Sequence, residues 1–237
     1  MPSSKASMAL TAELVARVAR REPDRGPIPG LIHHSEQDYD DLVASLLAGH
    51  NSDQLWVFAY GSLIWKPEFE FIAHERATAR GWHRSFCLRI ARWRGTPEQP
   101  GLMMALDRGG QCAGVAYRLP DENWRDQLGR LVRREVTLKP SGNAPRWIKL
   151  KTDSGDRLAL AFTANPISRN YVRGLPPAEI AWTLARAAGH WGSGAEYLYQ
   201  TVTHLDSFGI RDRNLWRLQE LVAREIADWK AAASPES

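Results

Sequence analysis

The stretch FAYGSLIW, residues 58–65, decides how the fold is interpreted. An apolar run ends at Tyr60, turns at Gly61 and Ser62, and then becomes apolar again. Such a corner can be a strand-ending turn, a loop that presents a nucleophilic serine, or a cradle of backbone N–H groups for an anion or oxyanion. A phosphate-binding loop would read GxxxxGK(S/T) and a nucleophile elbow GxSxG, and the sequence has neither here. On this pattern alone, the turn and the cradle stay open as interpretations.

The residues after Gln54 show the pattern of a β-sheet. Short apolar or alternating runs are separated by clusters of Gly, Pro and Asp, as in strands joined by turns. These runs are LWVFAY (55–60), SFCLRI (85–90), LMMAL (102–106), CAGVAYRL (112–119), RWIKLKT (146–152) and LALAFT (158–163). After Asn165 the pattern becomes helical, and we expect helices near 177–191, 195–207 and 212–230. The sequence predicts an α+β fold, in which helices flank a mixed, mostly antiparallel, barrel-like sheet.

The first 50 residues have a helical pattern of their own. Apolar residues at helical spacing predict a helix over 10–21, and a Pro/Gly-rich connector follows at 22–30. Ser35 and Asp38 form a capping-box pattern at the start of a second helix. We therefore expect a helical extension over 1–53, a main domain over 54–230 and a disordered tail over 231–237.

Composition limits the class of protein. Of the 237 residues 43% are hydrophobic, which is enough for a substantial core. Two cysteines, Cys87 and Cys112, are too few for a disulfide framework, so we expect reduced thiols and a cytoplasmic location. No run approaches the roughly 18 apolar residues of a membrane span, and no secretory signal is visible. The net charge of +4 comes from scattered residues, so neither nucleic acid nor a membrane is an expected partner.

The helix expected over 121–136 carries a carboxylate on its apolar face. Pro120 and Asp121 are expected to open this helix. Its apolar stripe consists of Trp124, Leu128, Leu131 and Val132, and Glu135 falls near the middle of the same stripe. Either the helix end has reached the edge of the core, where Glu135 is solvated or paired with an arginine, or Glu135 points into a cavity. In a cavity, desolvation would raise its pKa and prepare it to accept a proton.

Metal-binding patterns are missing from the sequence. His74-Glu75 lacks the second histidine of HExxH, and neither cysteine belongs to a CxxC pair. The seven histidines show no ligand spacing. We therefore expect no metal site.

The stretch FAYGSLIWKPEF resembles the motif of the ChaC family of γ-glutamylcyclotransferases, which is close to GYGSLIW. The resemblance runs from about residue 55 to 222 in the order of the family, and residues 1–50 lie outside it. It continues through GWHRSFCL (81–88), RGTPEQPG (94–101), GVAYRLP (114–120), NYVRGLP (170–176) and EYLYQTV…LDSFGIRD (196–212). It implies a γ-glutamylcyclotransferase-like fold, and cleavage of glutathione to 5-oxoproline and cysteinylglycine without metal or cofactor.

The resemblance also implies roles for residues. The family's general base is the glutamate of an Arg-Glu pair at the end of the inserted helix, here Arg134-Glu135. Two departures stand out: Ala59 replaces a frequent glycine, and Val-Thr-Leu-Lys follows Glu135 where relatives often have a Gly-Tyr-containing stretch. The second departure bears on specificity for the peptide side of the substrate. The substrate loop of the family corresponds to Ala59, Tyr60, Gly61, Ser62, Leu63 and Ile64.

In the reaction that the resemblance implies, the α-amine of the γ-glutamyl group attacks its own γ-carbonyl. Glu135 takes the proton of the ammonium group and later passes it to the leaving amine. Arg94 is a candidate to bind the glycine carboxylate of glutathione with two parallel hydrogen bonds, and otherwise it is a solvated loop residue.

Three other functions stay open. One is cyclotransfer on other γ-glutamyl peptides or amines. The second is a non-catalytic anion- or nucleic-acid-binding relative, suggested by the pI of about 9.2 and the ARWRG stretch at 91–95. The third is a catalytically silent relative that serves as an interaction module. The sequence leaves the oligomeric state open.

Overall fold

The computed structural model describes residues 7–50 and 54–232 of the chain. The chain divides into two compact units, which are interleaved along the sequence. The barrel unit comprises 27–88 and 104–173, and the helical unit comprises 1–26, 89–103 and 174–237. The expected division at residues 53/54 and 230/231 coincides with neither boundary and stays a prediction. Most of the expected tail, 233–237, lies outside the described residues.

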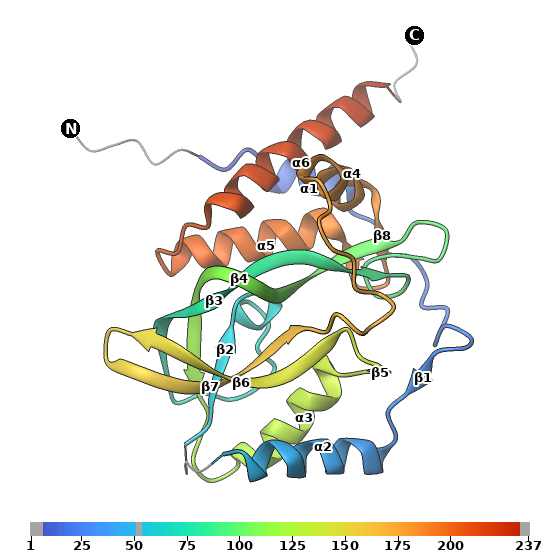
Figure 1. Cartoon of the computed structure of the whole chain (residues 1–237). Helices are drawn as coiled ribbons and strands as arrows, with labels where there is room; N and C mark the ends of the chain where they lie inside the picture. Colours follow the sequence, from blue (N-terminus) through green and yellow to red (C-terminus); the bar gives the residue numbers. More distant parts are fainter. Residues whose placement is uncertain (1–6, 51–53, 233–237) are drawn as a thin grey trace, which may run out of the picture. The chain divides into compact units, whose positions relative to one another are not determined.

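The barrel unit is built on a closed five-stranded barrel with the strand order β2-β4-β3-β6-β7 (Figure 1). Most recorded pairings are antiparallel, and β7 closes the barrel by short parallel pairings with β2 and β4. This confirms the mixed, mostly antiparallel, barrel-like sheet. The strands are β2 (Trp56–Ala59), β3 (Ala73–Ile90), β4 (Gly101–Arg118), β6 (Asn143–Thr152) and β7 (Gly155–Ala164).

Strand β4 combines two runs that the sequence separated. The predicted turn between LMMAL and CAGVAYRL contains Gly109 and Gly110, whose φ angles are 111° and 64°. The strand nevertheless continues through these exposed glycines, so the prediction of two strands was wrong. The first half of β3 was missed, because its buried positions Ala77 and Ala79 are small residues between charged ones.

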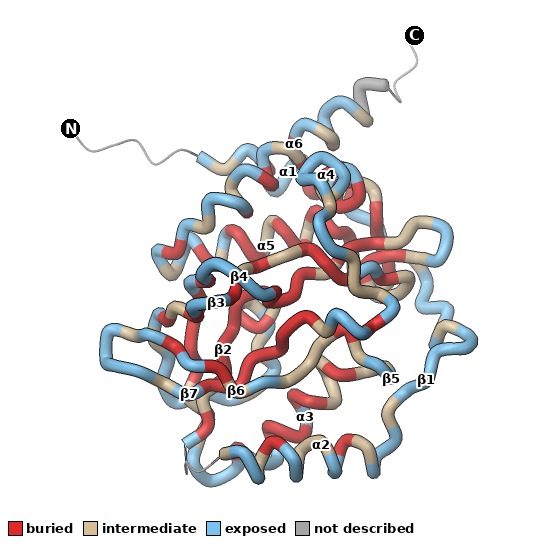
Figure 2. Tube along the Cα trace, viewed as in Figure 1, coloured by how far each residue is buried: buried red, intermediate tan, exposed pale blue. Residues whose placement is uncertain are grey.

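The core of the barrel unit is built from its strands, whose buried stretches are red in Figure 2. Strands β2 and β7 are partly buried on both faces, since the last three residues of β2 and the last six of β7 are all buried. Phe58, Leu106, Leu150, Leu160 and Phe162 are among the largest fully buried side chains. The tip of the β6–β7 hairpin is exposed.

Helix α3 (Trp124–Glu135) confirms the expected inserted helix and its buried stripe. Its expected start was wrong, because the N-cap is Asn123 rather than Asp121. The carboxylate of Asp121 is instead bound by Nη2 of Arg118, at 2.7 and 2.9 Å. The helix begins at Trp124, two residues later than a cap at Asp121 would place its start.

Helix α2 (Glu36–Ala48) lies beside α3 in the barrel unit (Figure 1). The capping box between Ser35 and Asp38 is present, as the sequence predicted. Two short strands that the sequence did not reveal, β1 (Ile32–His33) and β5 (Leu138–Lys139), pair antiparallel just before α2 and just after α3.

The helical unit contains α1 (Ala12–Val18), α4 (Pro177–Arg186), α5 (Gly194–Ser207) and α6 (Arg213–Ala232). Helix α4 ends earlier than expected, because residues 188–193 form the hairpin of β8 (Ala188–Gly189) and β9 (Gly192–Ser193). Gly192 has a φ of 97° in this hairpin. The first helix is tied to the last by Leu10, whose backbone N–H donates to Oε1 of Gln219 at 2.7 Å.

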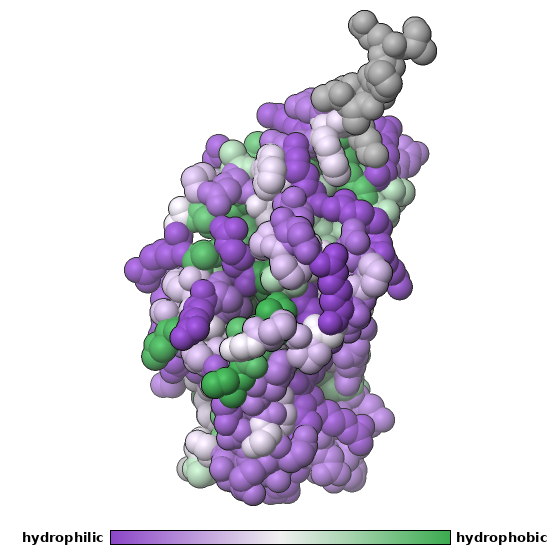
Figure 3. Space-filling view, turned by 90° about the vertical axis from the view of Figure 1, so that its right-hand side faces the viewer, coloured by the Kyte–Doolittle hydropathy of each residue, from purple (hydrophilic) through white to green (hydrophobic). Residues whose placement is uncertain are grey.

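Hydrophilic side chains predominate on the face drawn in Figure 3, and the hydrophobic ones are scattered among them. The large exposed apolar residues of the described chain come from separate segments, among them Ile32, Ile72, Ile167 and Trp191. No described helix is both long and apolar enough to cross a membrane.

Candidate active site

The Gly61-Ser62 corner opens a short 3-10 helix, η1 (Ser62–Ile64), directly after β2. Its hydrogen bonds use the N–H groups of Ile64, Trp65 and Lys66, which donate to the carbonyls of Gly61 and Ser62 at 2.8–3.1 Å. The N–H groups of Ser62 and Leu63 stand at the start of this helix, outside its own hydrogen bonds. The corner is therefore more than a strand-ending turn, and its geometry is compatible with a cradle. Gly61 has a φ of −138°, so a left-handed conformation does not explain the glycine.

Tyr60, the residue before Gly61, is held through both its side-chain hydroxyl and its backbone carbonyl. Its hydroxyl donates to the carbonyl of Phe162, and its own carbonyl accepts from Nε of Arg84 at 2.7 Å. Arg84 is 8% exposed and also donates to the carbonyl of Ala113. Sequence reasoning missed Arg84 as the residue that holds the loop. The sequence did contain a signal for its burial, because Arg84 lies on the same face of β3 as the buried Trp82 and Phe86.

Glu135 is the last residue of α3, and its side chain is 15% exposed. Its Oε1 lies 3.2 Å from Nε of Arg134, and its Oε2 accepts from Nδ2 of Asn143 at 3.4 Å. Burial raises the pKa of Glu135, the charge of Arg134 opposes this rise, and the charge of Glu68 adds to it. The carboxylate is thus paired with an arginine, as one interpretation of the sequence expected, and its pKa is raised by desolvation; that it points into a cavity stays a prediction. Such a carboxylate can serve as a general base.

Arg134 connects Glu135 to the end of the loop. Its Nη1 donates to the carbonyls of Lys66 and Pro67, at 2.7 and 3.0 Å, and lies 3.1 Å from Oε2 of Glu68. Lys66 lies two residues after Ile64, the last residue of the loop, so Arg134 contacts both Glu135 and the segment that follows the loop. Sequence reasoning missed Glu68 and Asn143, because no local pattern connects the loop that carries Glu68 or the start of β6 with the end of α3.

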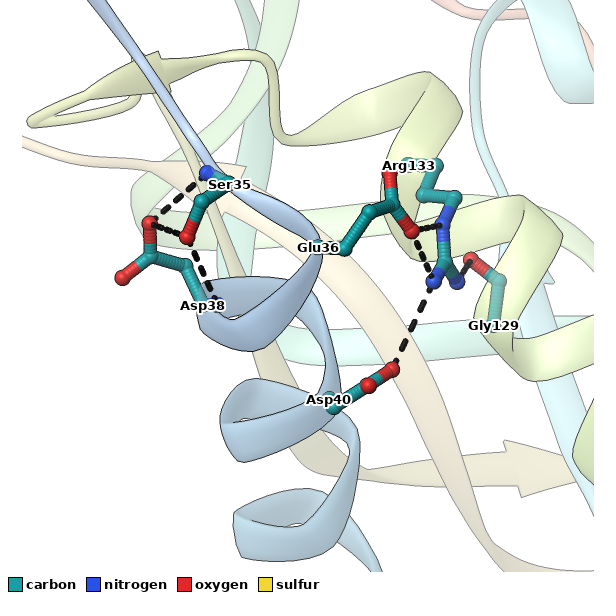
Figure 4. Close-up of polar contacts among 6 residues, drawn as sticks. All are labelled: Ser35, Glu36, Asp38, Asp40, Gly129 and Arg133. Carbon is teal, nitrogen blue, oxygen red and sulfur yellow. Dashed lines mark hydrogen bonds and ion pairs between the residues drawn. The ribbon is translucent and has the colours of Figure 1, made fainter.

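An ion-pair cluster holds α3 against α2 just before Glu135 (Figure 4). Arg133 binds Oε2 of Glu36 through Nε and Nη2, at 3.1 and 2.7 Å, and its Nη2 also reaches Asp40 at 3.4 Å. Its Nη1 donates to the carbonyl of Gly129 within α3. We call Arg133, Glu36 and Asp40 the α2–α3 clamp.

The segment just after Glu135 is held by the same N-terminal region. Leu138 and Lys139 pair with His33 and Ile32, and Lys139 forms an ion pair with Asp38. The hydrogen bond from Lys139 is the main reason why the pKa of Asp38 lies well below its usual range. The α2–α3 clamp and this pairing thus fix the chain on both sides of Glu135.

Arg94 lies in the helical unit, where it is 7% exposed. Its Nη1 donates to the carbonyl of Ser193 at 2.9 Å and to Oε2 of Glu196 at 3.0 Å. The alternative of a solvated loop residue is therefore wrong, and these contacts support the start of α5. A role of Arg94 in binding substrate stays a prediction.

Within the described residues we find neither a reactive cysteine nor a metal centre that could serve as an alternative to the site at Glu135. Cys87 and Cys112 are free and buried, and burial raises the pKa of the Cys87 thiol to about 12. A thiol with such a pKa stays protonated and is a poor nucleophile. Across residues 7–50 and 54–232, no group of three or more His, Cys, Asp or Glu side chains could hold a metal ion.

The fold is that of a γ-glutamylcyclotransferase. It is similar to the crystal structure of a glutathione-specific γ-glutamylcyclotransferase from yeast, with a TM-score of 0.66 and 20% identity over 73% of this chain and 97% of that chain. The model of the ChaC-like protein family matches residues 55–225. The chain belongs to this family, as the resemblance in the sequence indicated.

Two curated relatives illustrate the similarity. The glutathione-specific γ-glutamylcyclotransferase of Escherichia coli (strain K12) is 37% identical over 199 residues, which cover 84% of this chain and 85% of the relative. The glutathione-specific γ-glutamylcyclotransferase 1 of Mus musculus is 32% identical over 65% of this chain and 71% of the relative. The matched region of the family model begins after α2, so β1 and α2 lie outside it.

Proposed function

We propose that this chain is a glutathione-specific γ-glutamylcyclotransferase, which cleaves glutathione into 5-oxoproline and cysteinylglycine. The observation that carries the proposal is the largely buried carboxylate of Glu135, 15% exposed, whose neighbour and partner Arg134 also donates to Lys66, two residues after the 59–64 loop. The names of the curated relatives support glutathione as the substrate. Glu135 is the general base and acid of this proposal.

The substrate supplies its own nucleophile in this reaction. Glu135 removes a proton from the α-ammonium group, and the free amine attacks the γ-carbonyl carbon to close a five-membered ring. The bond from the γ-carbon to the cysteine nitrogen then breaks as Glu135 returns the proton to that nitrogen. The ring nitrogen, which still carries two hydrogens, gives its surplus proton to the released amine or to water, and this leaves the lactam N–H of 5-oxoproline and the ammonium form of cysteinylglycine. Correct folding of the substrate can lower the barrier by roughly 7–11 kcal/mol, and a placed general base contributes about 10²–10⁴-fold in rate.

The loop of residues 59–64 holds the γ-glutamyl part of the substrate. The N–H groups of Ser62 and Leu63, which the 3-10 helix does not use, are the donors that we assign to its carboxylate or to the developing oxyanion. Tyr60 contributes through its fixed backbone, because its hydroxyl is already bonded to Phe162. Ser62 has no nucleophilic role in this mechanism.

The test is incubation of the purified chain with glutathione, γ-glutamyl dipeptides and γ-glutamyl amines, with release of 5-oxoproline as the readout. We expect release from glutathione to be the fastest. Faster release from the other compounds would instead identify a cyclotransferase for γ-glutamyl peptides or amines. No release from any of them, together with salt-sensitive retention on nucleic acid, would favour a non-catalytic relative.

We also propose that Arg94 binds the glycine carboxylate of glutathione and so contributes to substrate specificity. Arg94→Ala should reduce kcat/KM for glutathione much more than for a γ-glutamyl substrate without the glycine carboxylate. Equal losses for the two substrates would mean that Arg94 acts only through Ser193 and Glu196.

We also propose a cytoplasmic location. The free, buried thiols of Cys87 and Cys112 support it, since such thiols are typical of a reducing compartment. Cell fractionation with antibodies against the chain would test this location directly.

A further inference from the structure

Asn143 approaches Glu135 from the first position of β6. Its Nδ2 donates to the backbone carbonyl of Glu135 at 3.3 Å and to the carboxylate oxygen Oε2 at 3.4 Å. Both partners are acceptors, so the amide nitrogen has to face Glu135. The reversed amide would place its oxygen against these two oxygens. The orientation of Asn143 is therefore determined by its surroundings.

The other end of the same amide has no partner within the chain. Oδ1 of Asn143 is buried, and no described group donates a hydrogen bond to it. Three further buried side-chain atoms share this property in the described residues, namely Nδ1 of His34, Nδ1 of His50 and Nε of Arg118. Of these four residues, only Asn143 has a recorded hydrogen bond to Glu135.

A buried acceptor without a donor is costly, and such atoms in native proteins have an explanation in ligand, water or function. A water molecule or a bound ligand therefore supplies the hydrogen-bond partner of Oδ1. The γ-glutamyl substrate carries one cationic donor, its α-ammonium group, and Glu135 has to reach that same group to remove its proton. The ammonium group is thus placed beside the carboxylate that Asn143 contacts.

We propose that Asn143 is a substrate-binding residue whose Oδ1 accepts a hydrogen bond from the α-ammonium group of the γ-glutamyl substrate. This inference rests on the proposed function. Of the three ammonium protons, one passes to Glu135 and one is held by Oδ1 of Asn143. The resulting amine keeps the second hydrogen bond, which orients its lone pair toward the γ-carbonyl carbon. Asn143 itself gains and loses no proton.

The test compares two ligands that differ only in the α-amine. Glutathione carries the amine, whereas glutaryl-cysteinylglycine lacks it, cannot cyclise and acts as an inhibitor. In Asn143→Ala we expect the KM for glutathione to rise about tenfold or more, as for loss of a hydrogen bond to a charged group. The inhibition constant of glutaryl-cysteinylglycine should stay nearly unchanged.

Asn165→Ala is the matched control. Asn165 also stands beside the β6–β7 pair, but its Nδ2 donates to Ser141 and its Oδ1 accepts from Ile167. In this variant the KM for glutathione and the inhibition constant of glutaryl-cysteinylglycine should change by the same factor or not at all. If Asn143→Ala likewise weakened both ligands equally, or lowered only kcat, Asn143 would act solely on the shape of the site and the proposal would be overturned.

Asn143→Ser is a second variant, which serves if Asn143→Ala does not fold. Its short side chain places no oxygen at the position of Oδ1 and adds no charge beside Glu135. The preference for glutathione over glutaryl-cysteinylglycine should fall as in Asn143→Ala, and an unchanged preference would contradict the contact.

The two ligands also separate this inference from the proposed function. If the unchanged chain releases no 5-oxoproline, the proposed function fails. Calorimetric binding of both ligands to the same variants still decides whether Asn143 recognises the amine.

Discussion

At Glu135, burial opposes the charge that a general base needs. The carboxylate keeps Arg134 and Asn143 as partners, yet its pKa is raised. Glu135→Gln keeps the size and shape of the side chain and removes the basic site. We expect kcat for glutathione to fall by about 10²-fold or more, with the fold retained. Release of 5-oxoproline and circular dichroism check this, and residual activity above a tenth of the original would contradict the role.

The same residue makes stability depend on pH. Because the folded-state pKa of Glu135 is raised, the protonated form favours folding, and this contribution is lost as the pH rises through that pKa. Glutamine does not titrate. The Tm of Glu135→Gln relative to the unchanged chain should therefore increase from about pH 4 to about pH 8. Scanning calorimetry at both pH values measures it, and a decrease would show that Arg134 lowers the pKa more than burial raises it.

Ser62 tests whether the loop binds through its backbone. Ser62→Ala removes the hydroxyl but keeps the N–H group at the start of η1. We expect most of kcat/KM to remain, since the proposed donors are backbone groups. A loss as large as that of Glu135→Gln would assign a direct chemical role to the hydroxyl.

Between elements, the α2–α3 clamp holds the helix that carries the base. The double variant Glu36→Gln, Asp40→Asn removes both acidic partners of Arg133. We expect kcat to fall about 3- to 10-fold with little change in KM, because small displacements of a catalytic group are costly. Steady-state kinetics below the Tm check this.

Lys151→Met is the control for the clamp. It breaks an equally short surface ion pair, 2.7 Å from Nζ to Oδ1 of Asp156, on the β6–β7 hairpin. Exposed pairs of this kind contribute little to stability on their own. Equal effects of the two variants on kcat would mean that the clamp is an ordinary surface contact.

The sequence predicted those contacts that form between residues close together along the chain. The stripe of α3 and the capping box of Ser35 and Asp38 could be predicted, because both depend on residues three or four positions apart. Arg118 binds the carboxylate of Asp121, the expected cap, and such a contact between a strand end and a turn is not visible as a pattern. The pairing of Glu135 with an arginine could be predicted from its neighbour Arg134, whereas Glu68 and Asn143 could not, since they lie on other segments of the chain.

For the molecule as a whole, we expect activity without a metal or a thiol. Treatment with EDTA should leave 5-oxoproline release unchanged, and so should a folded Cys87→Ala, Cys112→Ala variant, because the proposed chemistry uses only Glu135 and the loop. The assay is repeated after chelation and again after addition of zinc. Loss of activity that zinc restores would overturn the cofactor-free mechanism.

The hydrogen bond between Leu10 and Gln219 spans 209 positions of the chain. On the ribosome, at about 5–20 residues per second, the N-terminal helix is therefore made about 10–40 s before its partner exists. For that time the nascent chain exposes three apolar side chains that are buried in the folded protein, namely Leu10, Val15 and Val18. We therefore expect α1, although it is made before α6, to dock only after α6 has been made.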